Sequence, residues 1–91
     1  MFKKEYVRYK GRNVELVLHD NELRFIVFEY GKKRRVILID NLLRQVIEGV
    51  EIYEEDVVDF AVHFLKYLKR AKPDIYEHNK LVIDTIIEHY V

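Results

Sequence analysis

Residues 14–30, VELVLHDNELRFIVFEY, decide the fold that this sequence predicts. Two runs rich in valine, leucine and phenylalanine, which favour extended strands, flank the pair Asp20-Asn21. Aspartate and asparagine tolerate the positive φ angles that a two-residue hairpin turn requires. With this pair as the loop, Leu16 lies opposite Phe25, and both point to the same side. The stretch therefore predicts a β-hairpin with one apolar face.

Two further strands flank this hairpin in the predicted sheet. Residues 2–9 precede the turn KGRN at 10–13, and residues 34–39 follow the turn GKK at 31–33. Side chains alternate between the two faces of a strand, so the three turns collect apolar residues of one parity on one side. That predicted core face carries Val7, Tyr9, Val14, Leu16, Leu18, Leu23, Phe25, Val27, Val36 and Leu38. We therefore predict a four-stranded antiparallel β-meander over residues 2–39.

The opposite face of the predicted sheet mixes aromatic, aliphatic and basic side chains. Antiparallel sheets with one side in water usually alternate more cleanly between apolar and polar residues. We therefore expect this second face to be covered by other elements or to bind a partner. Its candidate partner-binding residues are Tyr6, Arg8, Arg24, Phe28, Tyr30 and Arg35.

Helices are predicted after the sheet. They span residues 41–48, residues 54–70, and a third stretch from Pro73 to about residue 90. Asp40 is a suitable N-cap for the first helix, and Gly49 is a suitable C-terminal stop. The second helix is apolar over most of its circumference, which indicates that it is covered on more than one side. The expected fold class is α+β, a single domain over 1–91 with three α-helices packing on the sheet.

The composition argues against catalysis. The sequence has no serine and no cysteine, and its only aliphatic hydroxyl is Thr85. An activated nucleophile needs a neighbouring base and an orienting group, and nothing near Thr85 supplies them. Gly11, Gly31 and Gly49 stand alone, whereas phosphate-binding loops need clustered glycines. We therefore expect a non-catalytic protein without a cofactor.

Metal binding is also not expected. The four histidines lie far apart in sequence, and thiolate ligands are absent. Asp59 and His63 are four residues apart and can share one face of a helix, but no third ligand accompanies them. Surface histidines in solvent are the expected interpretation.

Basic residues gather at two of the predicted turns. Residues 1–40 carry ten Lys or Arg and six Asp or Glu, whereas residues 41–91 carry six and ten. If the first and third turns lie at the same end of the sheet, their basic side chains form a patch suited to phosphates. Beside the aromatic residues of the second face, this patch indicates single-stranded nucleic-acid or DNA binding as an alternative function. The candidate residues are Lys10, Arg12, Lys32, Lys33, Arg34 and Arg35.

The function we expect first is that of a small intracellular interaction protein acting as a homodimer. A large apolar sheet face left exposed is seldom tolerated by monomers, so a second copy or another protein is the expected partner. No signal peptide or transmembrane run is recognisable, and we expect a cytoplasmic protein with no membrane partner and no small-molecule substrate. The scarcity of thermolabile side chains and the abundance of charge favour a thermophilic source.

Overall fold

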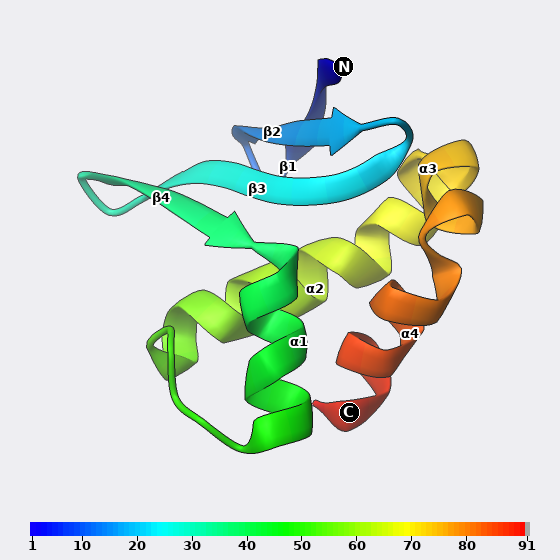
Figure 1. Cartoon of the computed structure of the whole chain (residues 1–91). Coiled ribbons are helices and arrows are strands. Elements are labelled where there is room, and N and C mark those ends of the chain that lie inside the picture. Colours follow the sequence, from blue (N-terminus) through cyan, green and yellow to red (C-terminus); the bar gives the residue numbers. More distant parts are fainter. Residues whose placement is uncertain (91) are drawn as a thin grey trace.

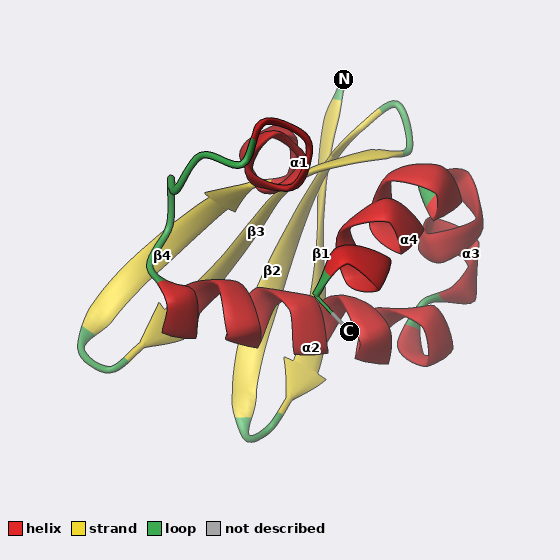
Figure 2. Ribbon diagram, turned by 90° about the horizontal axis from the view of Figure 1, so that it is seen from below, coloured by secondary structure: helices red, strands yellow, loops and turns green. Residues whose placement is uncertain are grey.

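The computed structural model describes residues 1–90. Its elements are β1 (Phe2–Tyr9), β2 (Arg12–His19), β3 (Glu22–Tyr30), β4 (Lys33–Leu38), α1 (Ile39–Glu48), α2 (Glu55–Ala71), α3 (Pro73–His78) and α4 (Lys80–His89). The strands form one antiparallel sheet in the order β1-β2-β3-β4, which confirms the predicted meander. The helices lie on one side of this sheet (Figures 1 and 2).

The first two turns are formed by residues in the left-handed region. Lys10 and Gly11 have φ angles of 49° and 76°, and Asp20 and Asn21 have φ angles of 50° and 71°. Two consecutive positive φ angles give a turn whose twist matches that of the flanking strands. The local residue choice therefore sets where each hairpin reverses.

A β-bulge in β3 changes the register that the sequence predicts. Arg24 is an extra residue on β3, so Leu16 lies opposite Ile26 rather than opposite Phe25. A shift of one residue moves a side chain to the other face of the sheet. The prediction that Leu16 and Phe25 share a face is therefore wrong.

Because of the bulge, the side chains of β3 beyond Arg24 and those of β4 point to the face opposite to the one predicted from simple alternation. β4 keeps its expected pairs with β3, such as Val27 with Val36, so its side chains move with those of β3. The face under the helices, called here the covered face, buries Val7, Val14, Leu16, Leu18, Leu23, Ile26, Phe28 and Ile37. The other face, called here the open face, carries Phe2, Lys4, Tyr6, Arg8, Asn13, Glu15, Val17, His19, Glu22, Phe25, Val27, Glu29, Arg34, Val36 and Leu38.

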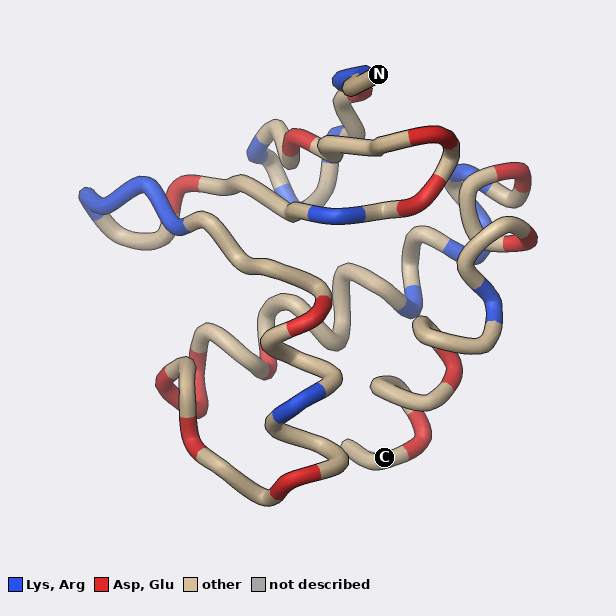
Figure 3. The backbone as a smooth tube through the Cα atoms, in the orientation of Figure 1, with Lys and Arg blue, Asp and Glu red and all other residues tan. Residues whose placement is uncertain are grey.

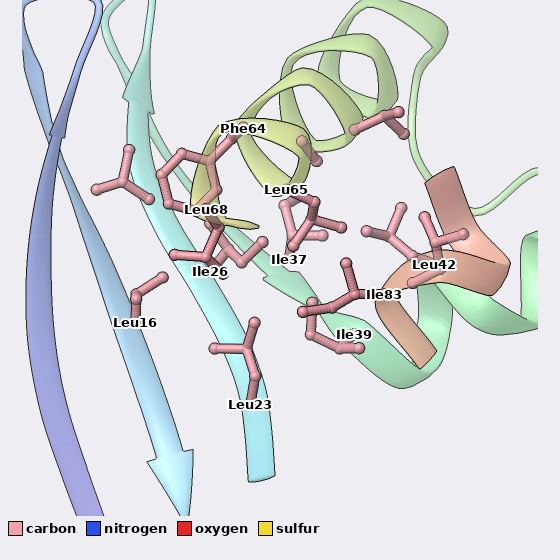
Figure 4. Packing of buried hydrophobic residues seen from close by; sticks show 14 of the residues in the cluster. Leu16, Leu23, Ile26, Ile37, Ile39, Leu42, Phe64, Leu65, Leu68 and Ile83 are labelled. Carbon is pink, nitrogen blue, oxygen red and sulfur yellow. The ribbon is translucent and has the colours of Figure 1, made fainter. Parts of the chain in front are cut away.

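Helix α2 lies across the covered face and forms the centre of the core, as its pattern predicts. Its buried side chains are Val57, Val58, Ala61, Val62, Phe64, Leu65 and Leu68. Figure 4 shows Phe64, Leu65 and Leu68 of α2 together with buried residues of the strands, of α1 and of α4. The helix is thus enclosed by the sheet and by the other helices, which explains its narrow polar stripe.

The ends of α1 differ in how well they match the sequence. The helix begins directly after β4 with Leu38 at the N-cap, so Asp40 lies in the first turn and is not the predicted cap. Gly49 follows the last turn with a φ of 69°, and its N–H donates to the carbonyl oxygen of Gln45, as a C-terminal stop requires. The direct transition from strand to helix leaves no room for a separate cap.

The single helix predicted after Pro73 is interrupted at Asn79, which separates α3 from α4. Asn79 has a φ of −122°, outside the helical range. Its Oδ1 accepts the N–H of Leu23 at 2.9 Å, and its Nδ2 donates to the carbonyl oxygens of Asn21 at 2.9 Å and of Ile75 at 2.8 Å. The amide thus joins the C-terminal helices to the β2–β3 turn, which a continuous helix would not allow at this residue.

Candidate docking surface

The predicted partner-binding residues do not share one surface. Tyr6 and Arg8 lie on the open face of β1 and are exposed. Phe28, Tyr30 and Arg35 lie on the covered face, because the bulge precedes them. Arg24 is the bulge residue itself, and its Nη1 lies 3.7 Å from a carboxylate oxygen of Asp40 at the start of α1. The second face predicted from the sequence is therefore divided between the two sides of the sheet.

The aromatic members of that predicted face belong to the core. Phe28 is only 2 % exposed, and its ring centroid lies 4.3 Å from that of Phe60 on α2. Tyr30 is half-buried beside the same ring, with centroids 6.1 Å apart. Burial and the nearby carboxylate of Asp56 raise the pKa of Tyr30. These rings hold α2 on the sheet, so Phe28 is not available for stacking on a base.

Arg35 is held by a carboxylate of the helical half of the chain. Its Nη1 and Nη2 donate to the two oxygens of Glu54 at 2.7 and 2.9 Å, a bidentate geometry that combines charge with two aligned hydrogen bonds. The hydrogen bond from Arg35 is the main reason that the pKa of Glu54 falls to about 2. This ion pair is one place where the basic and acidic halves of the sequence neutralise each other within the fold.

Arg12 is likewise engaged inside the molecule. Its Nη1 donates to the carbonyl oxygen of Glu29 at 2.7 Å, and its guanidinium lies 5.0 Å from the centroid of the Phe60 ring. A guanidinium over an aromatic face gains a cation–π attraction. Arg12 and Arg35, two of the predicted nucleic-acid contacts, therefore serve the fold.

The remaining basic candidates lie at one end of the sheet. The first and third turns of an antiparallel meander share an end, and they carry Lys10, Lys32 and Lys33, all exposed. Figure 3 shows where lysine and arginine lie along the backbone. Arg34 lies on the open face, with its Nη2 3.8 Å from a carboxylate oxygen of Glu15. Acidic residues lie close by, since Asp56 and Asp59 line a pocket together with Lys10. The basic patch is thus smaller than the six residues predicted.

The open face has an apolar centre that no helix covers. Pairs across the strands place Val27 beside Val36, and Phe25 beside both Leu38 and Val17. At the edges, Tyr6 is 59 % exposed and Phe2 is 63 % exposed, and Val36 is 46 % exposed near the middle of β4. Val27 itself is only 7 % exposed, and Val17 and Phe25 are half-buried, so the exposed apolar side chains lie mainly on the two edge strands, β1 and β4.

Polar side chains on the open face pair with one another. Tyr6 Oη donates to Glu15 Oε1 at 3.3 Å, and Arg8 Nη1 donates to Asn13 Oδ1 at 3.3 Å. Two shallow hollows interrupt the face. One of about 160 Å³ is lined in part by Tyr6, Glu15 and Arg34, and one of about 200 Å³ is lined by Phe2, Arg24, Phe25, Leu38 and Asp40. The face is uneven, with one hollow lined by polar and apolar side chains together and the other mainly apolar.

Sequence reasoning assigned the apolar open-face residues Phe25, Val27, Val36 and Leu38 to the core. The run FIVF at 25–28 is apolar at four successive positions, so alternation within it cannot distinguish the two faces. The bulge is accompanied by contacts between Arg24 and residues distant in sequence, and such contacts cannot be read from the sequence alone.

Among residues 1–90, no group of three or more histidine or acidic side chains is arranged to hold a metal ion. Within the same residues, no helix is long and apolar enough to cross a membrane. Comparisons with family models, with curated proteins and with solved structures find no match for this chain, so its role is inferred from its own geometry.

Proposed function

We propose that this chain is a non-catalytic interaction protein that binds a protein partner through the open face of its sheet. The observation that carries the proposal is the one-sided arrangement of the helices (Figure 2), together with the exposure of Phe2, Tyr6, Val36 and Leu38 on the open face. Contiguous exposed apolar patches on small domains usually mark interaction sites.

The chemistry of the open face suits a protein better than a nucleic-acid backbone. Its basic residues are Lys4, Arg8 and Arg34, and its acidic residues are Glu15, Glu22 and Glu29. Binding to phosphates needs a surplus of positive charge, which these six residues do not provide. An apolar centre with a mixed polar rim is instead typical of protein interfaces.

A photo-crosslinking amino acid at position 36 tests this proposal in the natural host. Position 36 lies on the open face, and position 77 on α3 is an exposed control. We expect crosslinks to protein from position 36 that disappear when Tyr6→Glu is added on the same face, and that persist when Ile47→Glu is added on α1. Equal crosslinking from positions 36 and 77, or none from position 36, would contradict a docking role for the open face.

Binding of single-stranded nucleic acid is the second candidate function. It is favoured by Lys10, Lys32 and Lys33, which gather at one end of the sheet; within residues 1–90, no carboxylate lies at ion-pair distance from their amines. Titration of a labelled oligonucleotide at about 50 mM and about 200 mM salt tests it, because phosphate contacts weaken steeply as salt rises. The double variant Lys32→Glu/Lys33→Glu should abolish such binding, and Lys80→Glu on α4 is the matched control. No binding at the lower salt concentration removes this candidate.

We also propose a cytoplasmic location and a thermophilic source. The absence of cysteine fits a reducing compartment. A surface network in which Glu5 pairs with Lys3 at 3.3 Å and with Lys72 at 3.2 Å fits the ion-pair networks of heat-stable proteins. A midpoint of thermal unfolding above about 65 °C, the upper range of mesophilic domains, would support this source, and a lower midpoint would oppose it.

A further inference from the structure

We infer that the occupant of the open face is a second copy of the same chain, packed face to face with the first as a β-sandwich dimer. This inference rests on the proposed function and names the partner for the same surface. Two sheets that pack in this way lie about 10 Å apart, with the side chains of their inner faces interdigitated.

The size of the open face fits such a dimer. Four strands about 4.8 Å apart and roughly eight residues long at about 3.3 Å per residue give a footprint on the order of 500 Å². Accessible area exceeds footprint, because side chains stand out from the sheet. The face therefore approaches the roughly 800 Å² per partner of a standard protein interface.

The distribution of charge on the open face favours a second copy over a strongly charged partner. Arg8, Glu29 and Arg34 lie at the end of the sheet nearest the first and third turns. Phe25 and Leu38 lie toward the opposite end, together with Lys4, His19 and Glu22. The face thus carries charges of both signs at each end, so it can pair with a copy of itself.

Sedimentation equilibrium over a concentration series from about 1 to about 500 μM, a range that brackets micromolar association, tests the inference. We expect the wild-type chain to pass from monomer to dimer. Val36→Glu should raise the dissociation constant at least ~100-fold, because it buries an unpaired carboxylate in the interface. Ile47→Glu is the matched control, since this α1 side chain is 70 % exposed on a different surface. Circular dichroism checks that each variant is folded, and Tyr6→Glu on β1 is the second variant if Val36→Glu fails to fold.

The outcomes separate the inference from the proposed function. A wild-type monomer at every concentration overturns self-association, whereas protein crosslinks from position 36 would still support docking of another protein. A dimer that persists in both Val36→Glu and Tyr6→Glu overturns the open face as the dimer interface. If position 36 then gives no crosslinks either, the proposed function fails as well.

Discussion

Replacing either of two phenylalanines in the same strand should have very different effects, because the bulge at Arg24 places them on opposite faces. Phe28 is 2 % exposed and contacts Phe60 of α2, with ring centroids 4.3 Å apart. Truncating a buried phenylalanine costs about 3–5 kcal/mol, which includes the cavity that remains. Phe28→Ala should therefore lower the free energy of unfolding by an amount comparable to the whole stability of a marginal domain, about 5 kcal/mol.

Phe25 lies only three residues away but has no helix above it. It is half-buried among open-face neighbours, so Phe25→Ala in the monomer should cost about 1 kcal/mol, the usual size of a substitution outside the core. Urea unfolding at a protein concentration below self-association measures both values, with the slope of the transition as a check on two-state behaviour. If Phe28→Ala leaves no folded protein, Phe28→Leu replaces it. A loss for Phe25→Ala equal to or larger than that for Phe28→Ala would refute the bulged register and restore the register expected from simple alternation.

Two further substitutions test how the helices are held on the sheet. Asn79→Ala removes three hydrogen bonds and leaves the buried N–H of Leu23 without its acceptor, so the free energy of unfolding should fall by about 2–4 kcal/mol. Urea unfolding measures this loss. A change below about 0.5 kcal/mol would show that α3 and α4 do not depend on this amide. Arg35→Gln should destabilise the fold at neutral pH and by much less in acid. The pKa of Glu54 is about 2 in the fold against an ordinary 4.5, so the ionised carboxylate stabilises the fold above pH 4.5. This contribution is lost as the pH falls from 4.5 to about 2. Unfolding of the wild type and of Arg35→Gln across the window measures the difference, and a difference that does not shrink in acid would contradict the ion pair.

Local chemistry made much of the fold predictable. Asp20-Asn21 and Gly31 mark reversals that depend on backbone preferences of one or two residues, so the strands and their order follow from the sequence. The central helix was equally recognisable, because an apolar surface over residues 54–70 requires cover on several sides. In both cases the deciding signal lies within the element itself.

Long-range contacts decided what the sequence left open. The bulge residue Arg24 lies near Asp40, and its neighbour Leu23 donates to Asn79, which is 56 residues away along the chain. Neither partner is visible in the alternation of β3, where both parities are apolar. The same contact to Asn79 breaks the predicted third helix. The register of β3 and the break between α3 and α4 therefore go with contacts between residues distant in sequence, which local preferences do not reveal.

The candidate site was predictable only in part for the same reason. Tyr6 lies in β1, where the register with β2 does not pass through the bulge, and it remains on an exposed sheet face. Phe28 and Arg35 lie beyond the bulge, and they moved into the core and into an ion pair. Which face of the sheet is open therefore depends on a single extra residue.

Hydroxyl-radical footprinting of the folded chain, read by mass spectrometry at low and at high protein concentration, tests most directly whether the open face is exposed and self-associating. Tyr6 should be modified in the dilute protein and protected in the concentrated protein, Leu81 on α4 should be modified equally in both, and Phe28 should remain unmodified throughout. Equal modification of Tyr6 at both concentrations would contradict self-association through the open face, and modification of Phe28 in the folded protein would contradict its place under the helices.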